Sequence, residues 1–170
     1  EVGHYLGPDR RFRLEPRVFT LDAPAVIDAA LEDVSVVLHW PGPFTRTSRP
    51  MADACIRRGV HYLDITGEIE VMEALAARTD EARAAGVMLM PGTGFDVVPT
   101  DCLARHLKQQ LPDARLLQLA IRGTGPLSHG TATTMLENRA SGGMVRRDGR
   151  LQRVPSGWRT RRIDFGDGKL

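Results

Sequence analysis

Short apolar runs alternate with longer amphipathic stretches along most of the chain. Five runs have the length and apolar composition of single strands, and they lie at residues 18–21, 34–38, 61–65, 87–90 and 115–121. Between them, apolar residues recur at helical spacing, which predicts helices over residues 24–31, 48–58, 68–85 and 100–111. Repeated strand–helix units predict an α/β fold, with a parallel sheet and helices on both of its faces.

The ends of these elements carry recognisable signals. Asp22 can cap the first helix, and Thr100 can cap the last one. Gly59 and Gly86 each follow a predicted helix, where the left-handed backbone that glycine adopts easily is common. The run at 34–38 is almost continuously apolar, which is typical of a parallel strand buried on both faces.

The alternation weakens after residue 123. Residues 131–139 predict a short helix. Residues 144–146 and 151–154 flank an Arg-Asp-Gly-Arg turn, which predicts a β-hairpin. We therefore expect a change of domain at about this point.

The composition fits a folded domain. The chain has 170 residues, of which 42% are hydrophobic and 26% charged, so it can build a core. Its longest purely apolar run, at 87–90, is far shorter than the ~20 residues that span a bilayer, so we expect no membrane span. Two cysteines cannot form a disulfide framework, which favours a cytoplasmic location.

Basic side chains gather toward the end of the chain. Residues 139–170 hold 9 of the 23 basic side chains and 3 of the 21 acidic ones. The arginines lie in predicted hairpin strands, with little aromatic interleaving beyond Trp158. We therefore expect a solvated or domain-facing surface and no nucleic-acid partner.

The loops that follow the predicted strands are the candidate ligand site. Right-handed crossovers place such loops at one edge of a parallel sheet, where ligands bind in open α/β folds. Here they contain Asp22 and residues 41–47, 64–68 and 91–100. These segments are also the richest in Gly, Pro, Thr and Asp, which independently favours a site at this edge.

Three acidic residues of these loops each have two interpretations. Asp22 either caps a helix only or also accepts a hydrogen bond from an adenine amino group. Asp64 and Glu68 could do acid–base chemistry. We favour a structural role, in which Asp64 holds loop amides and Glu68 faces a helix dipole.

The remaining reactive side chains give weaker signals. The five histidines have no metal-ligand spacing, so we predict no metal site, and only His129 is kept as a loop candidate. Cys55 and Cys102 fall within predicted helices and are expected to pack rather than react.

Residues 92–97, with the sequence GTGFDV, begin like a dinucleotide fingerprint. The fingerprint needs a third glycine for close packing and a helix that starts at once. Val97 fills that third position, and the predicted helix starts only near Thr100. We therefore interpret the segment as a ligand-edge loop that is not the primary phosphate-binding loop.

Four segments, in this order, resemble a known family. They are GPFTR at 42–46, YLDITGE at 62–68, GFDVVPTD at 94–101 and GTATTM at 130–135. Together they resemble the saccharopine dehydrogenase-like oxidoreductases, including the trans-acting enoyl reductases. The likeness covers about residues 17–165.

The resemblance implies a Rossmann-like fold, a cofactor and a set of site residues. It implies binding of NAD or NADP, with NADP favoured. The residues that it places against the dinucleotide are Gly42, Pro43 and Phe44. Those that it places on the nicotinamide side are Thr66, Gly67, Glu68, Gly94, Phe95 and Asp96. Asp22 joins them as a candidate for adenine. No catalytic residue is assigned.

The resemblance also implies a domain organisation. Residues 1–122 would be the C-terminal part of an incomplete Rossmann-like NAD(P)-binding domain. Residues 123–170 would begin an α+β second domain, for substrate or for dimerisation. Gly130 and Thr131 would open this domain, and we expect a homodimer through it.

Two parts of the family pattern have no counterpart here: the first strand–helix unit, with its glycine fingerprint, and the following strand, whose end selects NAD or NADP. We therefore expect the chain to be a fragment of a longer protein that binds the dinucleotide incompletely and is inactive alone. A processed or divergent small protein is the alternative. With those strands absent, we expect residues 18–21 to pair directly with residues 34–38.

The full-length parent would be an oxidoreductase that moves hydride to or from a C=N or C=C bond of a small-molecule substrate. The alternative is a non-catalytic α/β binding module that has lost its nucleotide site.

Overall fold

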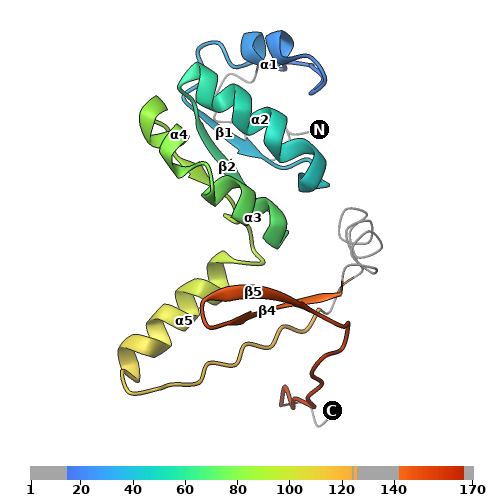
Figure 1. The fold of residues 1–170 in the computed structure, drawn as a ribbon, viewed down its shortest axis with the longest axis vertical. Helices are drawn as coiled ribbons and strands as arrows, with labels where there is room; N and C mark the ends of the chain where they lie inside the picture. The colour runs from blue at the N-terminus through green and yellow to red at the C-terminus, as the bar shows by residue number, and fades with distance from the viewer. Residues whose placement is uncertain (1–14, 124, 126–141, 167–170) are drawn as a thin grey trace, which may run out of the picture.

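The computed structural model describes residues 15–123, 125 and 142–166, and its first half is built on a parallel sheet (Figure 1). Three strands lie in the order β1-β2-β3: β1 (Val36–His39), β2 (His61–Asp64) and β3 (Leu89–Met90). The helices are α1 (Pro24–Ala30) before β1, α2 (Phe44–Arg58) between β1 and β2, and α3 (Ile69–Ala76) and α4 (Thr79–Ala85) between β2 and β3. The predicted α/β fold is confirmed, as a parallel sheet flanked by helices and consistent with a partial Rossmann-like domain.

The core lies between the helices and one face of the sheet. Tyr62 of β2 is completely buried there, among apolar side chains of α2 and α3. The alternate residues Val36, Leu38, Met88 and Met90 are exposed. The prediction that strand 34–38 is buried on both faces is therefore wrong, and the described helices cover one face of the sheet.

Residues 18–21 form no strand, so the predictions of a strand there and of its pairing with residues 34–38 are wrong. The Nη1 atom of Arg17 donates to the carbonyls of Ala30 and Glu32, each at 2.7 Å. These bonds hold the segment across the end of α1 instead of alongside β1.

Several predicted helix boundaries also differ. The residues that precede α1 and α5 are Ala23 and Val97, and neither helix end has a side-chain cap, so the capping roles predicted for Asp22 and Thr100 are wrong. α2 begins at Phe44, four residues before its predicted start. Gly59 and Gly86 do end α2 and α4 in the left-handed conformation, as predicted.

The predicted helix at 68–85 is interrupted between α3 and α4. Arg78 leaves the helical conformation, with φ −96° and ψ 15°. Its guanidinium contacts Asp53 of α2 at 2.7 Å and Glu81 at 2.8 Å. The contact with Asp53 holds the turn against α2, and the contact with Glu81 joins it to the first turn of α4.

The segment after the sheet leaves many apolar side chains exposed. Helix α5 (Val98–Gln110) has no buried residue, and Leu103 and Leu107 are exposed. Residues 115–121 are not a strand, contrary to prediction, and Leu116 and Ile121 are exposed. A strand is stabilised by the strands it pairs with, and none of the described strands pairs with this segment.

The predicted hairpin is confirmed. β4 (Gly143–Arg147) pairs antiparallel with β5 (Arg150–Val154). Asp148 and Gly149 between them both have positive φ, as a two-residue hairpin turn of type I′ requires. Arg153 pairs with Glu70 of α3, and Arg146 lies 3.5 Å from Glu73 of the same helix.

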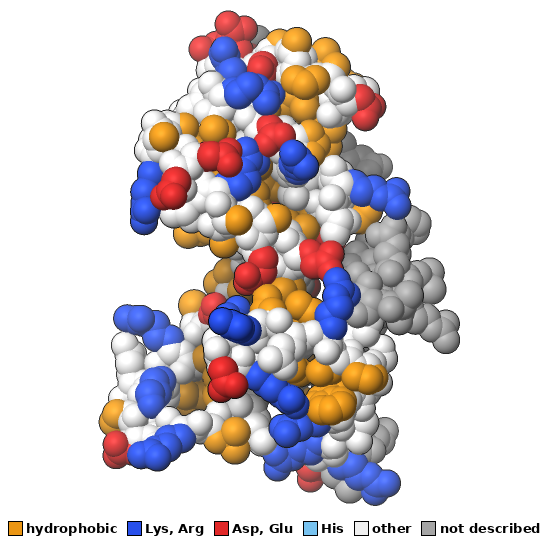
Figure 2. Space-filling model, viewed as in Figure 1, with side chains coloured by type: hydrophobic (Ala, Val, Ile, Leu, Met, Phe, Trp, Pro, Cys, Tyr) orange, Lys and Arg blue, Asp and Glu red, His pale blue; other side chains and the backbone are white. Residues whose placement is uncertain are grey.

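Basic side chains are frequent over the hairpin half of the molecule, in the lower part of Figure 2. The two ion pairs with α3 show that part of this basic surface faces another element of the chain.

The helix predicted at 131–139 lies outside the described residues. Across the described ranges, no helix has the length and apolarity needed to span a membrane.

Candidate functional site

Three loops meet at the carboxyl edge of the sheet. They follow β1, β2 and β3 and comprise residues 40–43, 65–68 and 91–97. Because the strands are parallel and adjacent, their carboxyl ends lie at the same edge. We call them the first, second and third loop.

Asp64 connects the second loop to the third. Its side chain is fully buried, and Oδ1 accepts hydrogen bonds from the backbone N–H groups of Thr66 at 3.0 Å and Gly92 at 2.9 Å. Oδ2 accepts a bond of 2.8 Å from the Tyr62 hydroxyl. The Asp64 carbonyl accepts a further 2.7 Å bond from the Thr93 hydroxyl. This arrangement favours the structural interpretation of Asp64.

The same burial fixes the role of the tyrosine. Burial, together with the negative charge of Asp64, raises the pKa of Tyr62 far above its ordinary value. The hydroxyl therefore keeps its proton and remains a donor to Asp64.

Glu68 connects the second loop to the first. Its Oε1 accepts a 3.0 Å bond from the backbone N–H of Phe44, and its Oε2 accepts a 2.8 Å bond from that of Thr45. These amides open α2, whose preceding residue Pro43 supplies no side-chain cap. A carboxylate there satisfies free N–H groups and faces the positive end of the helix dipole. The hydroxyl of Thr66, which is buried, accepts from the Glu68 backbone N–H at 3.0 Å.

The glycines allow the second and third loops to lie close together. A Cβ on Gly94 would lie 2.8 Å from Cβ of Ile65, so a side chain there would collide with the second loop. A Cβ on Gly67 would have only Asp96 Oδ2, at 3.9 Å, within reach. Beside them the Phe95 side chain is 82% exposed.

The structure thus brings most of the predicted site residues together. Phe44 and Glu68 are hydrogen-bonded, and Gly67 lies next to Asp96. Gly42, which precedes Pro43 through a cis peptide bond, is exposed in the first loop. Asp22 is exposed before α1, and no described hydrogen bond links it to the three loops.

His39 is a candidate site residue that sequence reasoning missed. It ends β1 just before the first loop and is only 4% exposed. Its Nε2 lies 2.9 Å from the hydroxyl oxygen of Thr47. Burial lowers the pKa of His39, and the negative charge of Asp64 acts in the opposite direction. The sequence did offer a signal, since His39 is a polar residue at the end of an apolar run and comes shortly before Pro41 and Gly42. His129, the histidine that was kept as a candidate, lies outside the described residues.

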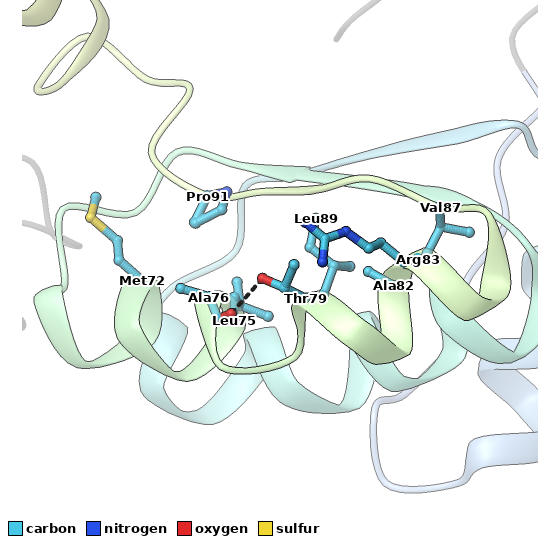
Figure 3. Close-up of a pocket in the computed structure, with 9 residues that line it drawn as sticks. All are labelled: Met72, Leu75, Ala76, Thr79, Ala82, Arg83, Val87, Leu89 and Pro91. Atoms are coloured by element: carbon cyan, nitrogen blue, oxygen red, sulfur yellow. Dashed lines mark hydrogen bonds between the residues drawn. The ribbon is translucent and has the colours of Figure 1, made fainter.

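Two pockets lie near these loops. One of about 180 Å³ is formed by Thr45, Gly67, Glu68, Ile69 and Glu70 together with Gly142, Met144 and Arg153 of the hairpin half. The other, of about 350 Å³, lies between β3 and helices α3 and α4, with Met72 at one end and Val87 at the other (Figure 3). Of the residues that line the larger pocket, only Pro91 belongs to the three loops. The smaller pocket is therefore the one at the candidate site. In the described part of the chain, no cluster of His, Cys, Asp and Glu could hold a metal.

Residues 6–90, which include the whole parallel sheet, match the family described as saccharopine dehydrogenase NADP binding domain. The chain belongs to this family. A trans-acting enoyl reductase of Mycobacterium leprae (strain TN) is 32% identical over 97 residues, which are 56% of this chain and 23% of the relative. A saccharopine dehydrogenase-like oxidoreductase of Mus musculus is 32% identical over 89 residues, 52% of this chain and 21% of the relative.

A trans-acting enoyl reductase of Mycobacterium ulcerans (strain Agy99) is 28% identical over 125 residues, 72% of this chain and 28% of the relative. The chain thus spans about a quarter of the length of the relatives it matches. No solved structure matches it. The predicted family is confirmed, as an NADP-binding oxidoreductase family that includes enoyl reductases.

Proposed function

We propose that this chain forms part of the NADP site of an oxidoreductase that moves hydride to or from a C=C or C=N bond. The observation that carries the proposal is the convergence of the three loops at the carboxyl edge of the sheet, which Asp64 and Glu68 hold together. The first two loops belong to the stretch that matches the NADP-binding family.

The exposed surface of these loops suits a flat ligand. Gly67 leaves its backbone open to close approach, and the Phe95 ring is free to contact the face of a planar group. The bound NADPH would supply the hydride, while these residues bind and orient it. The roles proposed are contact with the dinucleotide for Gly42, Pro43 and Phe44, and contact on the nicotinamide side for the second and third loops.

The pyrophosphate is the part of the cofactor that this chain accommodates least well. Helix N-termini with free amides normally bind it. At α2 the amides of Phe44 and Thr45 already bind Glu68. The sequence also holds no G-x-G-x-x-G motif. We therefore propose that the chain binds NADPH incompletely, with a dissociation constant weaker than ~10 μM.

The reaction of the whole protein is proposed from its relatives. Two of those described above are called enoyl reductases, and one is called a saccharopine dehydrogenase-like oxidoreductase. Their names support reduction at a C=C bond or chemistry at a C=N bond. The proposal also includes two domains, at 1–122 and 123–170, and a homodimer through the second of them. It further includes a small-molecule substrate and a cytoplasmic location.

Titration of the labelled chain with NADPH, followed by amide chemical shifts, tests the cofactor site. We expect shifts concentrated in the three loops and an affinity weaker for NADH than for NADPH. Phe95→Ala should weaken binding, whereas Leu116→Ala, at a side chain that is 77% exposed on a distant segment, should not.

Two results would contradict the proposal. Absence of loop shifts with both nucleotides would favour the non-catalytic binding module. A dissociation constant of ~10 μM or tighter would mean that the chain also contains a pyrophosphate site.

A further inference from the structure

The imidazole of His39 lies at the end of β1, immediately before the first loop. Its ring centroid is 5.7 Å from that of Phe44, edge to face, and 6.0 Å from that of Tyr62. The ring is almost fully buried between these two aromatic side chains, which fix its orientation. Its Nε2 points to Thr47.

The direction of this hydrogen bond follows from the groups around Thr47. Its hydroxyl oxygen lies 2.7 Å from the carbonyl oxygen of Pro41 and 3.2 Å from that of Pro43. Carbonyl oxygens only accept, and a hydroxyl has one proton to give. The Thr47 proton therefore goes to the loop, and its oxygen accepts from His39, so Nε2 carries a hydrogen.

The charge of the imidazole follows from its surroundings. Burial lowers the pKa of His39, so at neutral pH the ring is uncharged and its single proton is the one on Nε2. A continuous chain of donors thus runs from the His39 ring through the Thr47 hydroxyl to the Pro41 carbonyl.

This chain of donors holds the start of the first loop, while Glu68 holds its end. The backbone N–H groups of Arg46 and Thr47 donate to the Pro43 carbonyl at 3.1 and 3.2 Å. The Glu68 carboxylate accepts from the two preceding amides, those of Phe44 and Thr45. The loop therefore has a fixed point on each side, and the one at Pro41 depends on the Thr47 hydroxyl.

We propose that His39 is a positioning residue for the dinucleotide: acting through Thr47, it keeps the first loop in the shape that contacts the cofactor. This inference rests on the proposed function. The competing explanation is that His39 only fills space in the core.

Substitutions separate these two explanations. A glutamine side chain can place an N–H near the position of the imidazole Nε2, whereas leucine keeps only the apolar volume. We expect His39→Gln to leave the NADPH dissociation constant within about twofold of the original, since the hydrogen bond is kept. His39→Leu and Thr47→Val should each weaken NADPH binding about fivefold, the value of one lost hydrogen bond of about 1 kcal/mol.

The double variant provides the sharpest comparison. Because both changes break the same chain of donors, His39→Leu combined with Thr47→Val should weaken binding about as much as either alone. Independent effects would multiply to about 25-fold, which would overturn the inference. The affinities come from the same amide-shift titration with NADPH.

Two measurements on the protein without nucleotide test the inference separately from the proposed function. Nitrogen-15 shifts of the His39 ring should show the proton on Nε2, and Thr47→Val should shift the amides of Phe44 and Thr45. A proton on Nδ1, or loop amides that do not respond to Thr47→Val, would overturn the inference. If these results appear but NADPH does not bind, the proposed function fails while the loop-holding role of His39 stands. Should His39→Leu fail to fold, Thr47→Val and His39→Gln still decide the matter.

Discussion

Removal of the Tyr62 hydroxyl tests whether the buried contact with Asp64 stabilises the site. In Tyr62→Phe the ring keeps its place in the core, but Asp64 Oδ2 loses the 2.8 Å bond. Both side chains are completely buried, so water does not replace the lost donor. Asp64 Oδ2 then has no other described hydrogen-bond donor.

The expected cost follows from the charge of the acceptor. Hydrogen bonds to charged groups contribute about 1.5–3 kcal/mol, compared with about 1 kcal/mol for neutral pairs. We therefore expect Tyr62→Phe to lower the free energy of unfolding by about 2 kcal/mol. That is a large share of the 5–15 kcal/mol typical of a domain.

Urea unfolding measures this change. The midpoint should fall while the slope stays the same, since the surface exposed on unfolding does not change. Asp64→Asn is the matched partner in a double-mutant cycle, and a coupling of about 1 kcal/mol or more is expected between residues in direct contact. A cost of Tyr62→Phe below about 0.5 kcal/mol, the level of an ordinary surface substitution, would refute the reasoning.

Three further predictions follow from other parts of the fold. Gly94→Ala should destabilise the protein by about 1–3 kcal/mol in urea unfolding, because its Cβ would lie 2.8 Å from Ile65 Cβ, whereas Gly123→Ala, with open space around it, should have little effect. Burial lowers the pKa of His39 in the folded state, so the free energy of unfolding should fall as the pH drops below about 6.5. Melting temperatures measured across this pH range should show a weaker pH dependence for His39→Gln. In hydrogen exchange, the amides of β3 should be protected more strongly than those of residues 18–21, which form no strand; equal, strong protection would contradict the described fold.

Features that depend on local pattern could be predicted from the amino-acid sequence. The alternation of apolar runs and amphipathic stretches predicted the parallel sheet, and the order of strands and loops predicted the edge where the site residues gather. Gly59 and Gly86 ended their helices as expected, because the left-handed conformation that each adopts costs glycine little. The hairpin turn at Asp148 and Gly149 was predicted for the same local reason.

Features that depend on a distant neighbour could not be predicted in this way and follow from the folded arrangement. Residues 18–21 and 115–121 have strand-like sequences but form no strands, since a strand exists only where another strand satisfies its backbone groups. The contact between Glu68 and the amides of Phe44 and Thr45 joins residues more than 20 positions apart. The burial of His39 likewise comes from Phe44 and Tyr62, which the fold places around it. Local pattern shows which backbone and side-chain groups need partners, and the packing of the helices on the sheet determines which partners they receive.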